Sequence, residues 1–94
     1  MEKLYKLINM KDVPIWFNAG KITESFDARE MLSRGEHPMA IVLHKASELG
    51  KDTIFELVTP FPPMPLIEKV RALGCDSFTD VVSETELRTY FYKL

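Results

Sequence analysis

A cluster of prolines directly follows the most apolar stretch of this chain and limits where regular structure can continue. Residues 53–59 read Thr-Ile-Phe-Glu-Leu-Val-Thr, a nearly continuous apolar run that is typical of a central strand in a sheet. Residues 60–65 read Pro-Phe-Pro-Pro-Met-Pro. Proline lacks a backbone donor and has a fixed φ, so this segment excludes regular structure until Pro65, which suits the first position of a helix. The sequence therefore predicts a central strand, a sharp break and then a helix.

Strand and helix patterns also alternate on the N-terminal side of this break. Residues 22–28 alternate apolar and polar side chains, which predicts a half-buried strand. Residues 29–36 read as a polar connection with a glycine near its end. From residue 38 to 49 the apolar side chains recur at helical spacing, and Gly50 is expected to end that helix.

The C-terminal third predicts one helix and two strands. Leu66, Val70 and Leu73 share the inner face of the second helix, which Gly74 is expected to end. Residues 76–82 and 86–92 are rich in strand-forming side chains, and a three-residue turn joins them.

The resulting order β-α-β-α-β-β predicts an α/β (α+β) two-layer sandwich with a mixed four-stranded sheet. Right-handed crossovers make the first three strands parallel and place both helices on one face, while the last strand returns antiparallel. We divide the chain into an N-terminal arm, residues 1–20, that packs on the domain, and the domain itself, residues 21–94. Trp16 and Phe17 of the arm are the candidates to cover the face that lacks helices.

The composition limits where in the cell the protein is expected and which kinds of partner it is expected to bind. Ninety-four residues with a net charge of −2 make one domain without the concentrated basic charge that nucleic-acid binding requires. The single cysteine, Cys75, excludes an internal disulfide and suits a reducing compartment. The first residues lack the pattern of a signal peptide, and no apolar run approaches the roughly 20 residues of a membrane span. We expect a cytoplasmic protein with neither a nucleic-acid nor a membrane partner.

The predicted topology brings two loops together. Both helices follow parallel strands, so their N-termini and the loops 29–37 and 60–65 should meet at one edge of the sheet. Helix N-termini attract anions, and Arg29 adds a fixed cation. His37 supplies an imidazole that can transfer a proton or bind a metal. The predicted ligand-binding residues are His37, Arg29, Glu36, Pro38, Pro60 and Phe61.

Each of these candidates has a structural alternative. His37 either caps the helix that starts at Pro38 or lies in solvent, Asp27 and Arg29 form an ion pair, and Cys75 is a small buried hydrophobe. Glycine-rich phosphate loops, Cys-x-x-Cys, His-Glu-x-x-His and serine-triad signatures are absent from the sequence. We therefore expect a protein that is not an enzyme, and no pattern identifies a metal or cofactor.

Three short segments in this order resemble domain-of-unknown-function family 2249, a prokaryotic relative of the TusA/SirA-like sulfur-relay proteins. These segments are Asp27-Ala28-Arg29, Gly35-Glu36-His37-Pro38 and Pro60-Phe61-Pro62-Pro63-Met64-Pro65-Leu66, and the resemblance covers residues 22–94. It implies a TusA-like fold in which His37 occupies the position of the sulfur-carrying cysteine. Ala40 stands where the second proline of the TusA motif would fall, and the preceding loop is longer.

Histidine cannot carry a persulfide, so the resemblance implies the fold and the place of the site without the relay chemistry. We expect a non-enzymatic module that binds a partner protein or a small anionic ligand at the edge that contains His37. The alternative is a metal- or haem-associated accessory protein in redox or sulfur metabolism, with His37 as a ligand. A homodimer through the open sheet face or the N-terminal arm is a further alternative.

Overall fold

The structure, a computed structural model, describes residues 13–94 and contains four strands in one sheet. In chain order its elements are the 3-10 helix η1 (Ala19–Lys21), strand β1 (Ile22–Asp27), helices α2 (Arg29–Ser33) and α3 (Met39–Ser47), strand β2 (Ile54–Thr59), helix α4 (Met64–Arg71) and strands β3 (Cys75–Ser83) and β4 (Glu86–Lys93). Among the described residues, no helix is long and apolar enough to cross a membrane.

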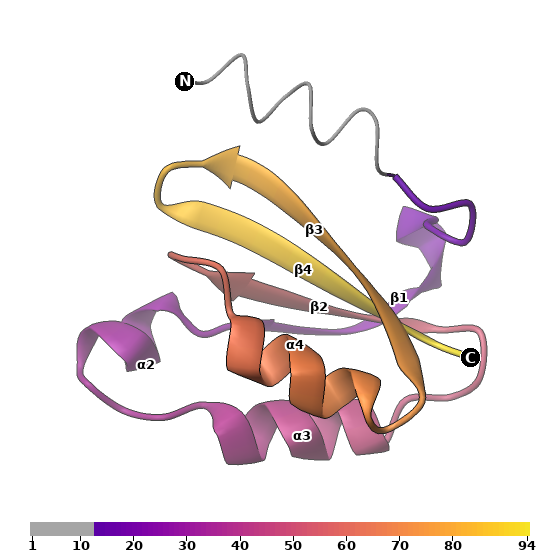
Figure 1. Ribbon diagram of the computed structural model, residues 1–94, viewed down its shortest axis with the longest axis horizontal. Coiled ribbons are helices and arrows are strands. Elements are labelled where there is room, and N and C mark those ends of the chain that lie inside the picture. The colour runs from indigo at the N-terminus through magenta and orange to yellow at the C-terminus, as the bar shows by residue number, and fades with distance from the viewer. Residues whose placement is uncertain (1–12) are drawn as a thin grey trace.

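The strands lie in the order β1-β2-β4-β3, so the last strand of the chain is inserted beside the central one (Figure 1). β1 pairs with β2 in parallel, and β4 is antiparallel to both of its neighbours, β2 and β3. β3 therefore runs in the same direction as β1 and β2, although it touches neither. The predicted fold class, a two-layer sandwich with a mixed four-stranded sheet, is confirmed.

The main core lies between the sheet and the helices α3 and α4, which cover the same face (Figure 1). Phe55 of β2 and Phe91 of β4 are fully buried, with ring centroids 6.0 Å apart. Val42 and Ala46 of α3 and Val70 of α4 are fully buried in the same cluster, as the helical spacing of apolar residues predicted. This packing fixes the position of both helices, and with it the position of their N-termini.

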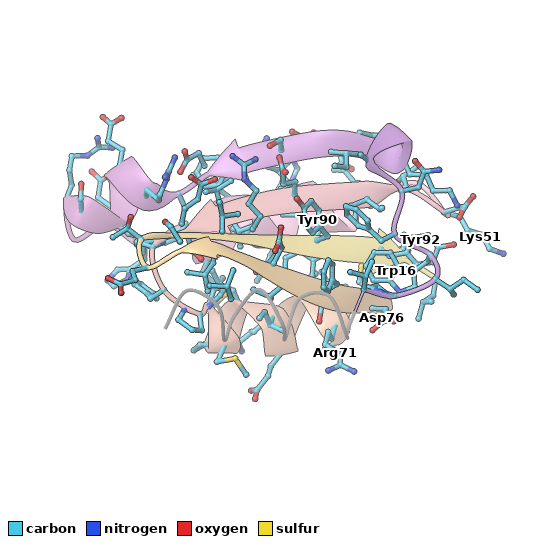
Figure 2. The ribbon with its side chains drawn as sticks, turned by 90° about the horizontal axis from the view of Figure 1, so that it is seen from above. Trp16, Lys51, Arg71, Asp76, Tyr90 and Tyr92 are labelled. Carbon is cyan, nitrogen blue, oxygen red and sulfur yellow. The ribbon has the colours of Figure 1, made fainter. Side chains whose placement is uncertain are left out.

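The N-terminal aromatic residues pack on the opposite face of the sheet. The indole of Trp16 stacks on Tyr92 and its Nε1 donates a hydrogen bond to Asp76 Oδ2 over 2.9 Å (Figure 2). Phe17 meets the ring of Tyr90 edge-on, with centroids 4.7 Å apart. These residues lie where the sequence placed the covering arm. The remainder of that arm, residues 1–12, lies outside the described residues.

The connection 29–36, which the sequence predicted only as a polar connection, contains a short helix, α2. Local contacts stabilise this turn of helix. Asp27 Oδ1 accepts a hydrogen bond from the backbone N–H of Arg29, and Glu30 forms an ion pair with Arg34 one turn later. Leu32 packs against the main core. With Leu32 as the one residue of this helix packed against the core, the stretch carried too weak a periodic signal to predict the helix.

The predicted helix ends also need correction. Pro38 is the N-cap of α3 and not its first residue, and no side chain caps that end. α4 starts at Met64, so Pro65 takes the second helical position. Both helices end before the glycines that follow them, because the backbone already tightens there: the N–H of Leu49, for example, bonds to the carbonyl of Ala46.

Candidate functional site

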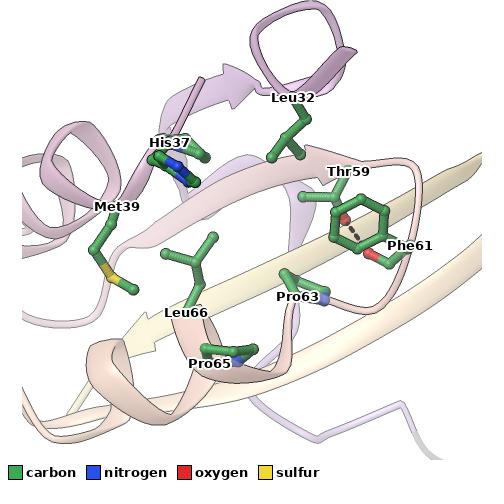
Figure 3. A pocket seen from close by; sticks show the side chains of 9 residues that line it. Leu32, His37, Met39, Thr59, Phe61, Pro63, Pro65 and Leu66 are labelled. Carbon is green, nitrogen blue, oxygen red and sulfur yellow. Dashed lines mark hydrogen bonds between the residues drawn. The ribbon is translucent and has the colours of Figure 1, made fainter. Parts of the chain in front are cut away.

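A pocket of about 180 Å³ lies at the edge of the sheet where β2 ends and where α3 and α4 begin (Figure 3). The residues that line it are Leu32, His37, Pro38, Met39, Thr59, Phe61, Pro63, Pro65 and Leu66. They come from α2, from the loop before α3 and its first residue, from the end of β2 and the loop that follows it, and from the start of α4. The two helix N-termini therefore meet at one edge, as the topology predicted.

Prolines and one hydrogen bond shape the wall of the pocket. Thr59 is fully buried, and its hydroxyl donates to the carbonyl of Phe61 over 2.7 Å (Figure 3). This bond turns the chain sharply after β2. Pro38 and Pro63 are both buried and stand at the N-caps of α3 and α4, where the missing proline N–H costs no helical hydrogen bond. The loop 60–63 is thereby fixed without any glycine.

The lining is apolar apart from two side chains. The hydroxyl of Thr59 is used within the loop, which leaves the imidazole of His37 as the one ionisable group among the lining residues. Leu32, Met39, Phe61 and Leu66 supply the rest of the surface together with the prolines. A pocket of this kind excludes water from an apolar guest, and it offers little to a small charged one.

His37 itself is exposed and lies at the pocket wall (Figure 3). Since the N-cap of α3 is Pro38 and has no side-chain hydrogen bond, the alternative that His37 caps this helix is wrong. The other alternative, that the imidazole lies in solvent, agrees with its exposure. The imidazole therefore borders both the solvent and the apolar cavity.

Arg29 belongs to an ion-pair cluster and does not line the pocket. Its Nη2 lies 2.7 Å from Asp27 Oδ2 and its Nη1 lies 3.5 Å from Glu86 Oε1. The ion pair of Asp27 with Arg29 agrees with the sequence-based alternative. The hydrogen bond from Arg29 lowers the pKa of Asp27 below its ordinary value. Arg29 is thus shared between two carboxylates, which reduces its value as a free cation for an anionic ligand.

Of the other predicted site residues, Pro38 and Phe61 line the pocket, while Glu36 and Pro60 do not. Glu36 accepts a hydrogen bond from Arg34 Nη2 at 2.9 Å. The sequence did not identify Leu32, Met39 or Leu66 as site residues. Their apolar side chains look like core positions in any periodic pattern, and only the incomplete packing between the two helix starts distinguishes them.

A second polar cluster, on the face of the sheet opposite the helices, was also missed. Glu56 Oε2 lies 3.1 Å from Arg88 Nη1, and its Oε1 accepts a hydrogen bond from Ser25. Burial raises the pKa of Glu56, but the hydrogen bonds from Ser25 and Arg88 outweigh it, and the pKa lies below the ordinary value. Burial, together with the negative charge of Glu56, raises the pKa of Tyr90 to about 12. Only the pairing register of β1, β2 and β4 brings these residues together.

Cys75 is 4% exposed at the start of β3, the far end of the sheet from the pocket, and burial raises the pKa of its thiol. It is the buried hydrophobe that the sequence suggested. Within residues 13–94, no group of three or more His, Cys, Asp or Glu side chains is placed to hold a metal ion.

No family model, no curated protein and no solved structure matches this chain. The resemblance of residues 22–94 to the TusA/SirA-like proteins therefore stays a prediction from the three short segments that carry it.

Proposed function

We propose that this chain is a non-enzymatic binding module whose pocket takes one apolar side chain of a partner polypeptide. The observation that carries the proposal is the combination of size and lining at the start of α3 and α4. An apolar cavity of about 150 Å³ accommodates a benzene ring, so the 180 Å³ here suits a single aromatic or branched aliphatic side chain. Pockets for drug-sized molecules start at about 300 Å³.

The rim of the pocket supports a polypeptide as the occupant. Phe61 is 50% exposed, and Met64, which lies between the lining residues Pro63 and Pro65, is 55% exposed. Large apolar side chains that gather around a cavity are typical of surfaces that meet another protein. If one side chain of the partner enters the pocket, the residues next to it in the partner can cover Phe61 and Met64.

The resemblance to the TusA/SirA-like proteins supports the same location. In that comparison His37 replaces the sulfur-carrying cysteine at the start of the first main helix. Without sulfur the residue cannot carry a persulfide, but it still lies at the pocket wall and can donate or accept a hydrogen bond at the mouth. The proposal therefore keeps a TusA-like recognition edge and omits the relay reaction.

Two other ligand classes receive less support. A small anion was expected from Arg29, but this guanidinium is held by Asp27 and Glu86. A metal- or haem-associated role would use His37 as a ligand beside an apolar wall. The pocket volume suits one side chain better than a macrocycle, so the polypeptide partner is preferred.

The proposal is tested by nuclear magnetic resonance titration with three capped amino acids. N-acetyl-phenylalaninamide and N-acetyl-leucinamide should produce saturable shifts at Leu32, Met39 and Leu66, with a Kd on the order of 1 mM for so small a guest. N-acetyl-serinamide should produce none. Equal, unsaturable shifts with all three compounds would contradict the proposal.

A matched pair of substitutions locates the binding. Leu32→Trp places a large ring in the pocket and should abolish the shifts, whereas Leu73→Trp, beyond the far end of α4, should leave them intact. Thermal melting shows whether each variant is folded. Full binding by a folded Leu32→Trp protein would place the guest elsewhere. Light scattering with dilution shows whether the partner is a second copy of the chain.

A further inference from the structure

Every arginine near the pocket edge is already shared between two carboxylates. Arg29 contacts Asp27 and Glu86, at 2.7 and 3.5 Å. Arg34 contacts Glu30 at 2.7 Å and Glu36 at 2.9 Å. Within the part of the chain that the structure describes, no guanidinium of this edge is left to meet an acidic partner, and the carboxylates around these two arginines outnumber them.

Arg88, on the adjoining face, is likewise shared between two carboxylates. Arg88 lies 2.8 Å from Glu86 and 3.1 Å from Glu56. Glu84, in the turn between β3 and β4, adds an exposed carboxylate at the same end of the sheet (Figure 1). Asp80 lies opposite Arg88 in the strand register. Among residues 13–94, carboxylates therefore outnumber basic side chains at the end of the molecule that holds the pocket.

The described lysines lie toward the end of the fold opposite the pocket. Lys21 precedes β1, Lys45 is in the last turn of α3, and Lys93 ends β4. Lys51 follows α3, and Lys69 lies in the last turn of α4. Among the described residues the charge is thus separated lengthwise. The end that contains the pocket is acidic, and at the far end lysines stand beside carboxylates, as in the pairs Lys21–Asp52 and Lys45–Glu24.

We infer that the partner segment is basic: an apolar anchor side chain flanked by arginine or lysine. This inference rests on the proposed function and names the partner chemistry of the same pocket. The anchor enters the apolar cavity, and its charged neighbours lie over the surplus carboxylates of α2 and of the β3–β4 turn. Complementary charge of this kind selects among partners that carry the same anchor, because a like-charged segment is repelled.

The test uses three peptides with one anchor: Ac-Arg-Phe-Arg-NH2, Ac-Ser-Phe-Ser-NH2 and Ac-Glu-Phe-Glu-NH2. At low ionic strength the basic peptide should bind about fivefold more tightly than the neutral one, and the acidic peptide more weakly. The ratio should fall toward one as salt is added, because exposed charges are screened. Equal affinities for all three would overturn the basic partner and leave the apolar pocket standing. If none of the three peptides binds, both the basic partner and the proposed apolar binding pocket are overturned.

Charge reversal at exposed carboxylates then localises the effect. Glu30→Lys and Glu84→Lys should each reduce the preference for the basic peptide about twofold without changing affinity for the neutral one. Glu48→Lys, at another exposed position, the C-cap of α3, is the matched control and should retain the preference. An identical loss in all three variants would show a mere net-charge effect and overturn the inference. Phenethylamine tests the polypeptide requirement: if it binds as tightly as the basic peptide, a small amine is the ligand.

Discussion

The indole of Trp16 lies parallel to the phenol ring of Tyr92, with centroids 4.9 Å apart and 7° between the ring planes. The same indole donates its N–H to Asp76. The segment before β1 is therefore attached to β4 by stacking and to β3 by a hydrogen bond. This contact joins the N-terminal aromatic residues to the sheet face that α3 and α4 leave open.

Trp16→Ala should lower the free energy of unfolding by about 2 kcal/mol, because it removes a half-buried ring, a stacked pair and a hydrogen bond. Ile15→Ala, at a fully exposed neighbouring position, should change it by less than about 0.5 kcal/mol. Urea unfolding followed by far-ultraviolet circular dichroism measures both. Equal stability of the two variants would show that the stack contributes nothing.

His37→Ala should leave stability within about 0.5 kcal/mol of the original protein, because the side chain is exposed and caps no helix. Binding of N-acetyl-phenylalaninamide should weaken severalfold, since part of the pocket wall is lost. The same titration and unfolding experiments measure the two effects. Unchanged affinity would exclude a role for His37 in the site.

Gly35→Ala should destabilise the protein by about 1 kcal/mol. Gly35 has a φ of +75°, which an L-residue adopts at a cost, although there is open space for the added methyl group. Gly50→Ala is the control, because Gly50 is not in the left-handed region and its new methyl group would make only ordinary contacts with Thr53. Thermal unfolding compares them. A tolerated Gly35→Ala would mean that the turn before His37 relaxes freely.

The carboxylate cluster on the open sheet face should make the protein sensitive to acid. The pKa values of Glu56 and Asp27 are both below their ordinary values in the folded chain. Their stabilising contribution is therefore full above about pH 5 and is lost as pH falls through the folded pKa values. Urea midpoints from pH 7 to pH 3 should decline, and Glu56→Gln should reduce that decline. Glu48→Gln, outside the cluster, should retain it.

At alkaline pH the controlling group should be Tyr90. Its pKa is raised to about 12, so the neutral phenol favours the folded chain. This contribution is full below about pH 10, the pKa of an ordinary tyrosine, and is lost as pH rises toward 12. Urea midpoints at pH 8, 10 and 11 should fall in the original protein and fall less in Tyr90→Phe. A parallel decline in both would assign the alkaline loss to another group.

Local chemistry in the sequence determined most of the element order. The apolar run 53–59 and the prolines after it defined a central strand, a break and a helix, because strand period and proline geometry act over a few residues. The Asp27–Arg29 ion pair was predictable for the same reason, since its partners are two residues apart. The helix α2 was not, because its stabilising contacts are one apolar anchor and side-chain bonds that no periodicity reveals.

The pocket was decided by the tertiary structure. Leu32, Met39 and Leu66 carry ordinary core side chains in sequence, and they form a cavity wall only because α2, α3 and α4 start at one sheet edge without filling the space between them. Trp16 and Tyr92 come together in the same way, through a sheet whose last strand is inserted next to the central one. Local patterns determine which segments become strands and helices. Which side chains meet, and where packing stays incomplete, depends on the long-range pairing of those segments.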